Sequence, residues 1–267
     1  MAVLVMSIFI FLPYFPGDYD AMVITLSTFV QVLAMSGLLF VPVGIIWLMY
    51  ELLKRKNVTY RFAITSLIIF CFVGIFSTIG AFVNSPSFGF IVLVVFIYLF
   101  KIFFSRIKQI RNNGDRNFNP TPCYLIFIPV LVVFIRFLFI DFATDFSRNT
   151  AIKHSEQLIK AIELYQEKNN HYPLSLLSLW EDYKPSIIGI KRFYYEPHGT
   201  TYNLYFEQFA TELSVQEIVM YNKLDEHQFS SHNSDLLVLT PEQINLQRGY
   251  FGKYDLPTPH WKYFWFD

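Results

Sequence analysis

The stretch YLIFIPVLVVFIRFLFI, residues 124–140, is a nearly pure hydrocarbon run that leads directly into the polar stretch DFATDFSR, residues 141–148. The run is long enough for a helix to cross the apolar core of a bilayer, which takes about 20 residues with a range of roughly 17 to 25. The polar stretch contains neither Gly nor Pro, so nothing in it ends a helix. The sequence therefore predicts a helix that begins in a membrane and runs on into water.

The composition of the chain changes at the same place. Of the 267 residues, 54% are hydrophobic and 19% are aromatic, and the mean hydropathy of +0.37 is too high for an ordinary soluble protein. Residues 1–140 hold 10 Lys and Arg against 4 Asp and Glu, whereas residues 141–267 hold 11 against 17. We therefore predict a basic membrane region, residues 1–141, and an acidic soluble domain, residues 142–267. An acidic domain repels phosphate, so nucleic acid is not an expected partner.

Three further apolar runs are long enough to span a bilayer, and they comprise residues 21–50, 62–83 and 88–104. Residues 2–15 form a shorter run that ends in PYFPGD, which is either a shallow first span or a re-entrant start. Within the first long run, Gln31 is the one strongly polar interruption, and Pro42 and Gly44 predict a kink. The sequence predicts a polytopic α-helical membrane region of four or five spans, surrounded by the lipid bilayer.

Basic residues are confined to alternate connections between these runs, which predicts how the chain is oriented. Those that follow Tyr50 and Leu99 are Lys54, Arg55, Lys56, Arg61, Lys101, Arg106, Lys108, Arg111 and Arg116. The connections PGDYD and NSPS contain no basic residue. Because Lys and Arg near span ends resist translocation, the basic connections are expected in the cytoplasm and residues 142–267 outside it. The one glycosylation sequon, Asn57-Val58-Thr59, then lies on the inner side, where it is not modified.

The first part of the soluble domain has the pattern of an amphipathic helix. Between residues 147 and 169, apolar side chains recur at helical spacing and form one stripe, with Lys and Glu off it. Asn169 and Asn170 provide an end signal, and Pro173 prevents continuation. This helix can run on from the last span without a break.

The rest of the soluble domain has the pattern of antiparallel strands. PLSLLSLWEDYKP predicts a short helical turn. RFYYE and YNLYFEQ lie on either side of PHGT, which predicts a hairpin with Gly199 in the turn. SVQEIVMYN, DLLVL and the terminal WKYFWFD are further strand candidates. In WKYFWFD, one face of the strand carries Trp261, Tyr263 and Trp265. The other face carries Lys262, Phe264 and Phe266, a pattern typical of a strand buried on both faces. A docking strand or a contact with the membrane surface is the alternative interpretation of this segment.

The end of the helix and the segments after it resemble the globular region of type IV pilins, and especially the major pseudopilins of type II secretion. In those proteins a helix ending in Ala-Ile-x-x-Tyr is followed by Asn, by Tyr-Pro and by a Ser-Leu-x-x-Leu turn. The matching residues, within residues 145–210, are Ala161, Ile162, Tyr165, Asn170, Tyr172, Pro173, Ser175, Leu176 and Leu179. The resemblance implies a pilin-like α+β fold, with a long helix packed on a small antiparallel sheet.

The chain departs from that family at the start of the helix. The family carries a cleavable leader with Gly at the peptidase site and a Glu near the start of its hydrophobic helix. Here the helix begins at about Tyr124, follows three or four other spans and has neither feature. The resemblance therefore implies a pilin-like domain displayed by a polytopic membrane protein. It implies an interaction or assembly role in a bacterial inner membrane, with a periplasmic domain that binds envelope or membrane proteins through residues 142–267.

Arg136 is the candidate functional residue of the membrane region, because a charge within a span marks a proton relay or a substrate counter-ion. It also lies about one turn from the outer end of the run, where a long side chain can reach the interface. Asp141 is a poor partner because five residues place it on another helix face, whereas Asp18 or Asp20 in the outer connection is a better one. The alternative function is therefore a small membrane transporter or membrane-embedded enzyme that uses Arg136 and these outer-face carboxylates.

The soluble domain contains one weak candidate for a metal site. The segment LDEHQFSSHN places Asp225, Glu226, His227 and His232 within reach of one another, but in no recognised zinc spacing. Such residues are also typical of a solvated turn. The sequence contains no Gly-rich phosphate loop, nucleophile elbow or HExxH motif, so neither catalytic activity nor a cofactor is expected.

Overall fold

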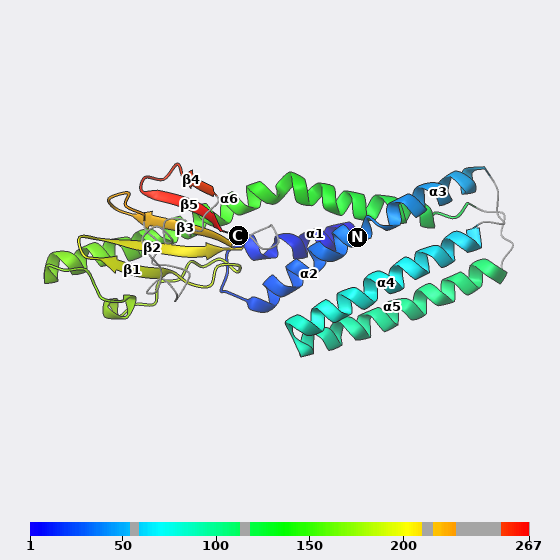
Figure 1. The fold of residues 1–267 in the computed structure, drawn as a ribbon, viewed down its shortest axis with the longest axis horizontal. Coiled ribbons are helices and arrows are strands. Elements are labelled where there is room, and N and C mark those ends of the chain that lie inside the picture. The colour runs from blue at the N-terminus through cyan, green and yellow to red at the C-terminus, as the bar shows by residue number, and fades with distance from the viewer. Residues whose placement is uncertain (54–58, 113–117, 210–215, 228–251, 267) are drawn as a thin grey trace, which may run out of the picture. The chain divides into compact units, whose positions relative to one another are not determined.

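The computed structural model describes residues 1–53, 59–112, 118–209, 216–227 and 252–266. It is mostly helical, at 66%, and a small antiparallel sheet follows the helices in the chain (Figure 1). The chain divides into two compact units. The membrane unit comprises Met1–Ile10 and Thr25–Phe139, and the sheet unit comprises Phe11–Ile24 and Ile140–Asp267.

The helices are α1 (Ala2–Phe11), the 3₁₀ turn η1 (Leu12–Tyr14), α2 (Ala21–Gly37), α3 (Phe40–Leu52), α4 (Thr59–Asn84), α5 (Pro86–Asn112) and α6 (Thr121–Asn169). Three of them, α4, α5 and α6, are long and apolar enough to cross a bilayer, and α2 with α3 makes a fourth if the bent pair is one span. The ten residues of α1 extend about 15 Å, which is half the thickness of a bilayer core. These helices are consistent with an integral membrane protein.

The bend between α2 and α3 has a local cause. The two helices meet at an angle of 41°, and Leu38 and Leu39 lie between them. Pro42 has no N–H to donate to the carbonyl of Leu38, and its ring would clash with that carbonyl in a continuous helix. The carbonyl accepts instead from the N–H of Val41 at 3.1 Å. The predicted kink in this run is confirmed.

Small residues allow helices of the membrane unit to approach closely. A Cβ atom on Gly44 of α3 would lie 2.8 Å from Cγ1 of Ile126 and 3.2 Å from the carbonyl oxygen of Pro122, both on α6. A Cβ on Gly37 of α2 would lie 3.0 Å from Cβ of Pro129, the proline inside α6. Such glycines are typical of helix contacts in membranes, where dispersion forces rather than exclusion of water hold helices together.

Helix α6 is continuous from the apolar run into the amphipathic segment, as the sequence predicts. Its 49 residues extend about 74 Å, more than twice the thickness of a bilayer core. It ends at Asn169, and Asn170 has the left-handed φ of 57° that commonly follows a helix. The single helix therefore belongs to both units.

The sheet has the order β1-β2-β3-β5-β4, and all neighbouring strands are antiparallel (Figure 1). The strands are β1 (Tyr194–His198), β2 (Thr201–Gln208), β3 (Gln216–Asn222), β4 (Gly252–Asp255) and β5 (Trp261–Phe266). The predicted hairpin is confirmed, with Gly199 in the turn at a φ of 65°. Strand β4 was not predicted, and the candidate DLLVL lies outside the described residues.

Helix α6 packs on one face of this sheet. Its fully buried Ala151, Leu158 and Ile162 share a core with Leu204 and Phe206 of β2. The opposite face buries Ile218, Met220 and Phe264. Trp261 belongs to the first core and Phe264 to the second, so β5 buries side chains on both faces. Successive side chains of a strand point to opposite faces, so the sheet has the larger core on the face covered by α6 and a smaller buried cluster on the other face.

The segment between α1 and α2 is part of the sheet unit. The backbone N–H groups of Gly17, Ile188 and Gly189 donate to the carbonyls of Ser186, Phe15 and Pro13 at 3.0, 3.1 and 2.7 Å. A Cβ on Gly189 would lie 2.7 Å from the carbonyl oxygen of Pro13. The connection PYFPGD is therefore an integral part of the domain formed by the C-terminal half of the chain.

Candidate functional site

A chain of polar groups surrounds Arg136 in the membrane unit. Nε of Arg136, on α6, donates a hydrogen bond of 2.8 Å to Oε1 of Gln31 on α2. The amide nitrogen of Gln31 donates to Oγ of Ser27 at 3.3 Å, and this hydroxyl donates to the carbonyl of Ile10 at 2.8 Å. Ser27 is fully buried and Gln31 is 8% exposed. The chain connects α6, α2 and α1 through groups that a bilayer core cannot hydrate.

The surroundings of Arg136 contain two groups that favour a cation. Its guanidinium carbon lies 5.3 Å from the centre of the Phe137 ring, which adds a cation–π contact to the amide oxygen of Gln31. Arg136 and Gln31 are both conspicuous in the sequence as polar residues in apolar runs. Their pairing was missed because it depends on which faces of α2 and α6 pack together.

The carboxylates considered as partners of Arg136 lie at different places in the chain. Asp20 caps α2, because its Oδ1 accepts hydrogen bonds from the backbone N–H groups of Met22 at 2.8 Å and Val23 at 3.4 Å. Asp18 and Asp141 are exposed. All three carboxylates belong to the sheet unit, whereas Arg136 belongs to the membrane unit. An ion pair between Arg136 and these groups stays a prediction.

The metal candidates lie at the turn after β3, and the structure adds His260 to them. Nδ1 of His260 is 3.1 Å from Oδ2 of Asp225, and the ring nitrogens of His227 lie 3.2 Å from the carbonyls of Asp225 and His260. Glu226 is exposed, and His232 lies outside the described residues. In the part of the chain that the structure describes, no three His, Cys, Asp or Glu side chains form a ligand set.

A buried arginine, Arg148 of α6, is a residue that the sequence did not point to. Its Nη2 is 2.6 Å from Oε1 of Glu217 on β3, and its Nη1 is 2.8 Å from Oδ1 of Asp145. Its guanidinium carbon lies 4.3 Å from the centre of the Tyr263 ring, and Nε1 of Trp265 donates to Oε2 of Glu217 at 2.9 Å. These contacts fix α6 to β3 and β5, which is a structural role.

Among the described residues of the sheet unit, the most exposed large apolar side chains belong to the loop after α6, residues 173–180, which we call the apolar loop. Leu174, Leu177 and Trp180 are 84%, 88% and 94% exposed, whereas Leu176 and Leu179 pack on the core. Trp180 follows the 3₁₀ turn η3 (Leu176–Leu179) and has a φ of 60°, a left-handed conformation that is rare for a bulky residue. Three large apolar side chains exposed within seven residues are typical of a surface that docks on another protein.

Comparison of the chain with protein-family models, with curated proteins and with solved structures gives no match.

Proposed function

We propose that this chain is an integral membrane protein that displays an extracytoplasmic, pilin-like domain. The domain binds envelope or membrane protein partners in an assembly and has no catalytic activity of its own. The observation that carries the proposal is the apolar loop, in which Leu174, Leu177 and Trp180 are almost fully exposed. Exposed apolar clusters mark interaction sites, and Trp is enriched among the residues that contribute most to binding.

The arrangement of the sheet unit supports the pilin-like assignment. One long helix continues from an apolar half into an amphipathic half that packs on an antiparallel sheet. The residues that carry the family resemblance have local roles at the end of this helix. Asn170 takes the left-handed conformation after α6, the Tyr172 ring packs 5.0 Å from the Tyr202 ring, and the Tyr195 hydroxyl donates to the carbonyl of Pro173 at 2.9 Å.

The composition of the sheet unit supports one membrane topology. The unit contains Phe11–Ile24, before α2, and Ile140–Asp267, within and after α6. A chain that leaves a domain through α2 and returns to it through α6 crosses the bilayer an even number of times. Bent α2–α3 therefore counts as one span, together with α4, α5 and α6. The basic residues of the inner connections favour a sheet unit outside the cytoplasm, and we assign it to the periplasmic side of a bacterial inner membrane.

The experiment that tests this function is site-specific cross-linking in intact cells. A photoreactive amino acid replaces Trp180 in the tagged full chain, and adducts are purified in detergent and identified by mass spectrometry. We expect discrete adducts with envelope proteins, because the apolar loop is the surface that such partners cover.

The matched control carries the same photoreactive residue at Lys153, an exposed position of α6 outside the apolar loop. A combined Leu174→Ser and Leu177→Ser change should remove the adducts formed at Trp180. Recovery of the chain alone, or cross-linked only to itself through its spans, would count against an assembly role.

A transporter or membrane-embedded enzyme is the second candidate, and the hydrogen-bonded chain from Arg136 to Ile10 is the observation that favours it. In the assembly role, Arg136→Leu is tolerated and changes on the surface of the sheet unit abolish function. If the chain is a transporter or membrane-embedded enzyme, Arg136→Leu abolishes function and changes on the surface of the sheet unit are tolerated. Complementation of a deletion strain by the Arg136→Leu variant and by the variant with Ser at residues 174 and 177 distinguishes the two.

A further inference from the structure

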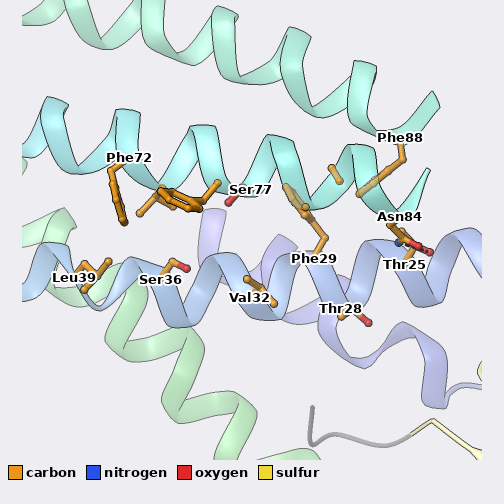
Figure 2. Close-up of a pocket in the computed structure, with 14 residues that line it drawn as sticks. Thr25, Thr28, Phe29, Val32, Ser36, Leu39, Phe72, Ser77, Asn84 and Phe88 are labelled. Carbon is orange, nitrogen blue, oxygen red and sulfur yellow. Dashed lines mark hydrogen bonds between the residues drawn. The ribbon is translucent and has the colours of Figure 1, made fainter. Parts of the chain in front are cut away.

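A groove of about 330 Å³ runs between α2 and α4 in the membrane unit (Figure 2). Thr25 and Asn84 lie at one end of it, and Leu39 and Phe72 lie at the other. Aromatic side chains form much of the wall, with Phe29 of α2 and Phe88 of α5 in edge-to-face contact at 5.3 Å. Among the described residues that line the groove, none is charged.

The size and chemistry of the groove limit what can occupy it. A mostly apolar wall does not hold water, since a water molecule needs several polar partners. The volume equals that of about ten water-sized groups, which suits a stretch of about ten methylenes. An extended hydrocarbon chain therefore matches both the volume and the mostly apolar wall of the groove.

The polar end of the groove has the chemistry of a lipid ester site. Nδ2 of Asn84 lies 3.4 Å from Oγ1 of Thr25, a long hydrogen bond that leaves the amide able to donate to another acceptor. Thr25 lies in the first turns of α2 and Asn84 is the last residue of α4. In the four-span topology both ends lie at the same membrane interface, where lipid ester carbonyls lie.

We infer that the groove between α2 and α4 binds one acyl chain of a bilayer lipid, with an ester carbonyl of that lipid accepting a hydrogen bond from Asn84. The uncharged wall selects for the chain and not for a charged headgroup. Gly80 opens the groove, since a Cβ atom there would meet nothing within 4 Å. The lipid fills the space that the absent side chain leaves between the two helices.

The test uses the full chain reconstituted in phosphatidylcholine vesicles that contain phosphatidylcholine with a diazirine in its acyl chain. After irradiation, labelled peptides are identified by mass spectrometry. We expect the label on peptides of α2 and α4 that line the groove. In Gly80→Leu and in Val32→Phe this label should fall about tenfold, the factor for about 1.4 kcal/mol, because the added side chains occupy the space of the acyl chain.

The matched control is Ile79→Phe, which adds bulk beside Gly80 at an exposed position outside the groove and should leave the labelling unchanged. Gel filtration and thermal unfolding check the fold of each variant, and Val32→Phe decides the test if Gly80→Leu is misfolded. Equal labelling of all exposed helix faces, unaffected by both groove variants, would overturn the inference. Cross-links between two copies at the groove, in place of lipid adducts, would overturn it as well.

Discussion

Arg148 and Glu217 are charged groups taken almost completely out of water, at 6% and 5% exposed. Arg148→Met removes the cation and leaves the Glu217 carboxylate buried, so the free energy of unfolding should fall by about 3–5 kcal/mol. The measurement is denaturant unfolding of the full chain in detergent, followed by Trp fluorescence. Trp265 reports on the change directly, because its indole donates to Glu217.

The matched control for that variant is Lys184→Met, in an ion pair with Asp182 whose side chains are 59% and 82% exposed. Exposed pairs contribute roughly 0–1 kcal/mol, so this variant should unfold nearly as the natural chain does. The double variant Arg148→Met, Glu217→Met should recover part of the loss, since it buries no unpaired charge. Equal stability of Arg148→Met and Lys184→Met would contradict the role of Arg148 in holding α6 to the sheet.

His227 should make the stability of the sheet unit depend on pH. Burial lowers the pKa of His227 below its ordinary 6.5, and nearby Lys262 adds to the effect, against hydrogen bonds to the carbonyls of Asp225 and His260. The unfolded chain therefore binds this proton more readily. The contribution of His227 is constant above pH 6.5 and declines as the pH falls through 6.5 towards the pKa of the folded state.

The measurement is the Tm of the full chain at about pH 7.5 and about pH 5.5. The natural chain should lose more stability between these values than His227→Gln does, because glutamine takes up no proton. Identical losses in the two chains would show that the pKa of His227 is the same in the folded and the unfolded chain.

Among the helices, α3 and α6 approach each other where Gly44 faces Ile126 and Pro122. Gly44→Ala should destabilise the chain by about 1–3 kcal/mol, because its Cβ would lie 2.8 Å from Ile126 Cγ1 and 3.2 Å from a backbone oxygen. Gly80→Ala makes the same chemical change on α4 where a Cβ meets nothing within 4 Å. It should be neutral or stabilising by up to about 1 kcal/mol, since Ala favours helix. Thermal unfolding in detergent measures both, and equal effects would contradict this close approach.

The elements that the sequence predicts are those with local signals. The length of α6 follows from the absence of Gly and Pro in residues 141–148, and the β1–β2 hairpin follows from Gly199 between alternating strands. The kink follows from Pro42. Each of these needs only neighbours within a few residues.

The features that the sequence did not predict depend on contacts between distant residues. GKYD, residues 252–255, has no strand pattern and becomes β4 because it pairs with β5. The pairing of residues 13–17 with residues 186–189 cannot be read from either segment. Gln31 and Arg136 were each visible as polar residues, but their hydrogen bond depends on the faces that α2 and α6 present to each other. The exposure of Leu174 and Leu177 likewise depends on which Leu of the loop the core accepts.

For the whole molecule, an apolar loop outside the cytoplasm requires that the sheet unit, including the connection between α1 and α2, lies on the outer side of the membrane. The sheet unit includes Phe11–Ile24, so Tyr19 and Asp182 must lie on the same side whatever the orientation. The basic residues of α5 favour the opposite side for Lys108. Backbone pairing therefore predicts one side of the membrane for Tyr19 and Asp182, and the basic residues independently predict the other side for Lys108.

Single-cysteine variants test both predictions. With Cys71 and Cys123 replaced by Ser, we expect Tyr19→Cys and Asp182→Cys to react with a membrane-impermeant maleimide in cells whose plasma membrane is intact. Lys108→Cys should react only after permeabilisation, because a charged reagent does not cross the bilayer core. Labelling of Asp182→Cys but not Tyr19→Cys would contradict the assignment of Phe11–Ile24 to the sheet unit. Labelling of Lys108→Cys alone would leave that assignment intact and reverse the orientation, because an even number of spans returns the chain to the side from which it left.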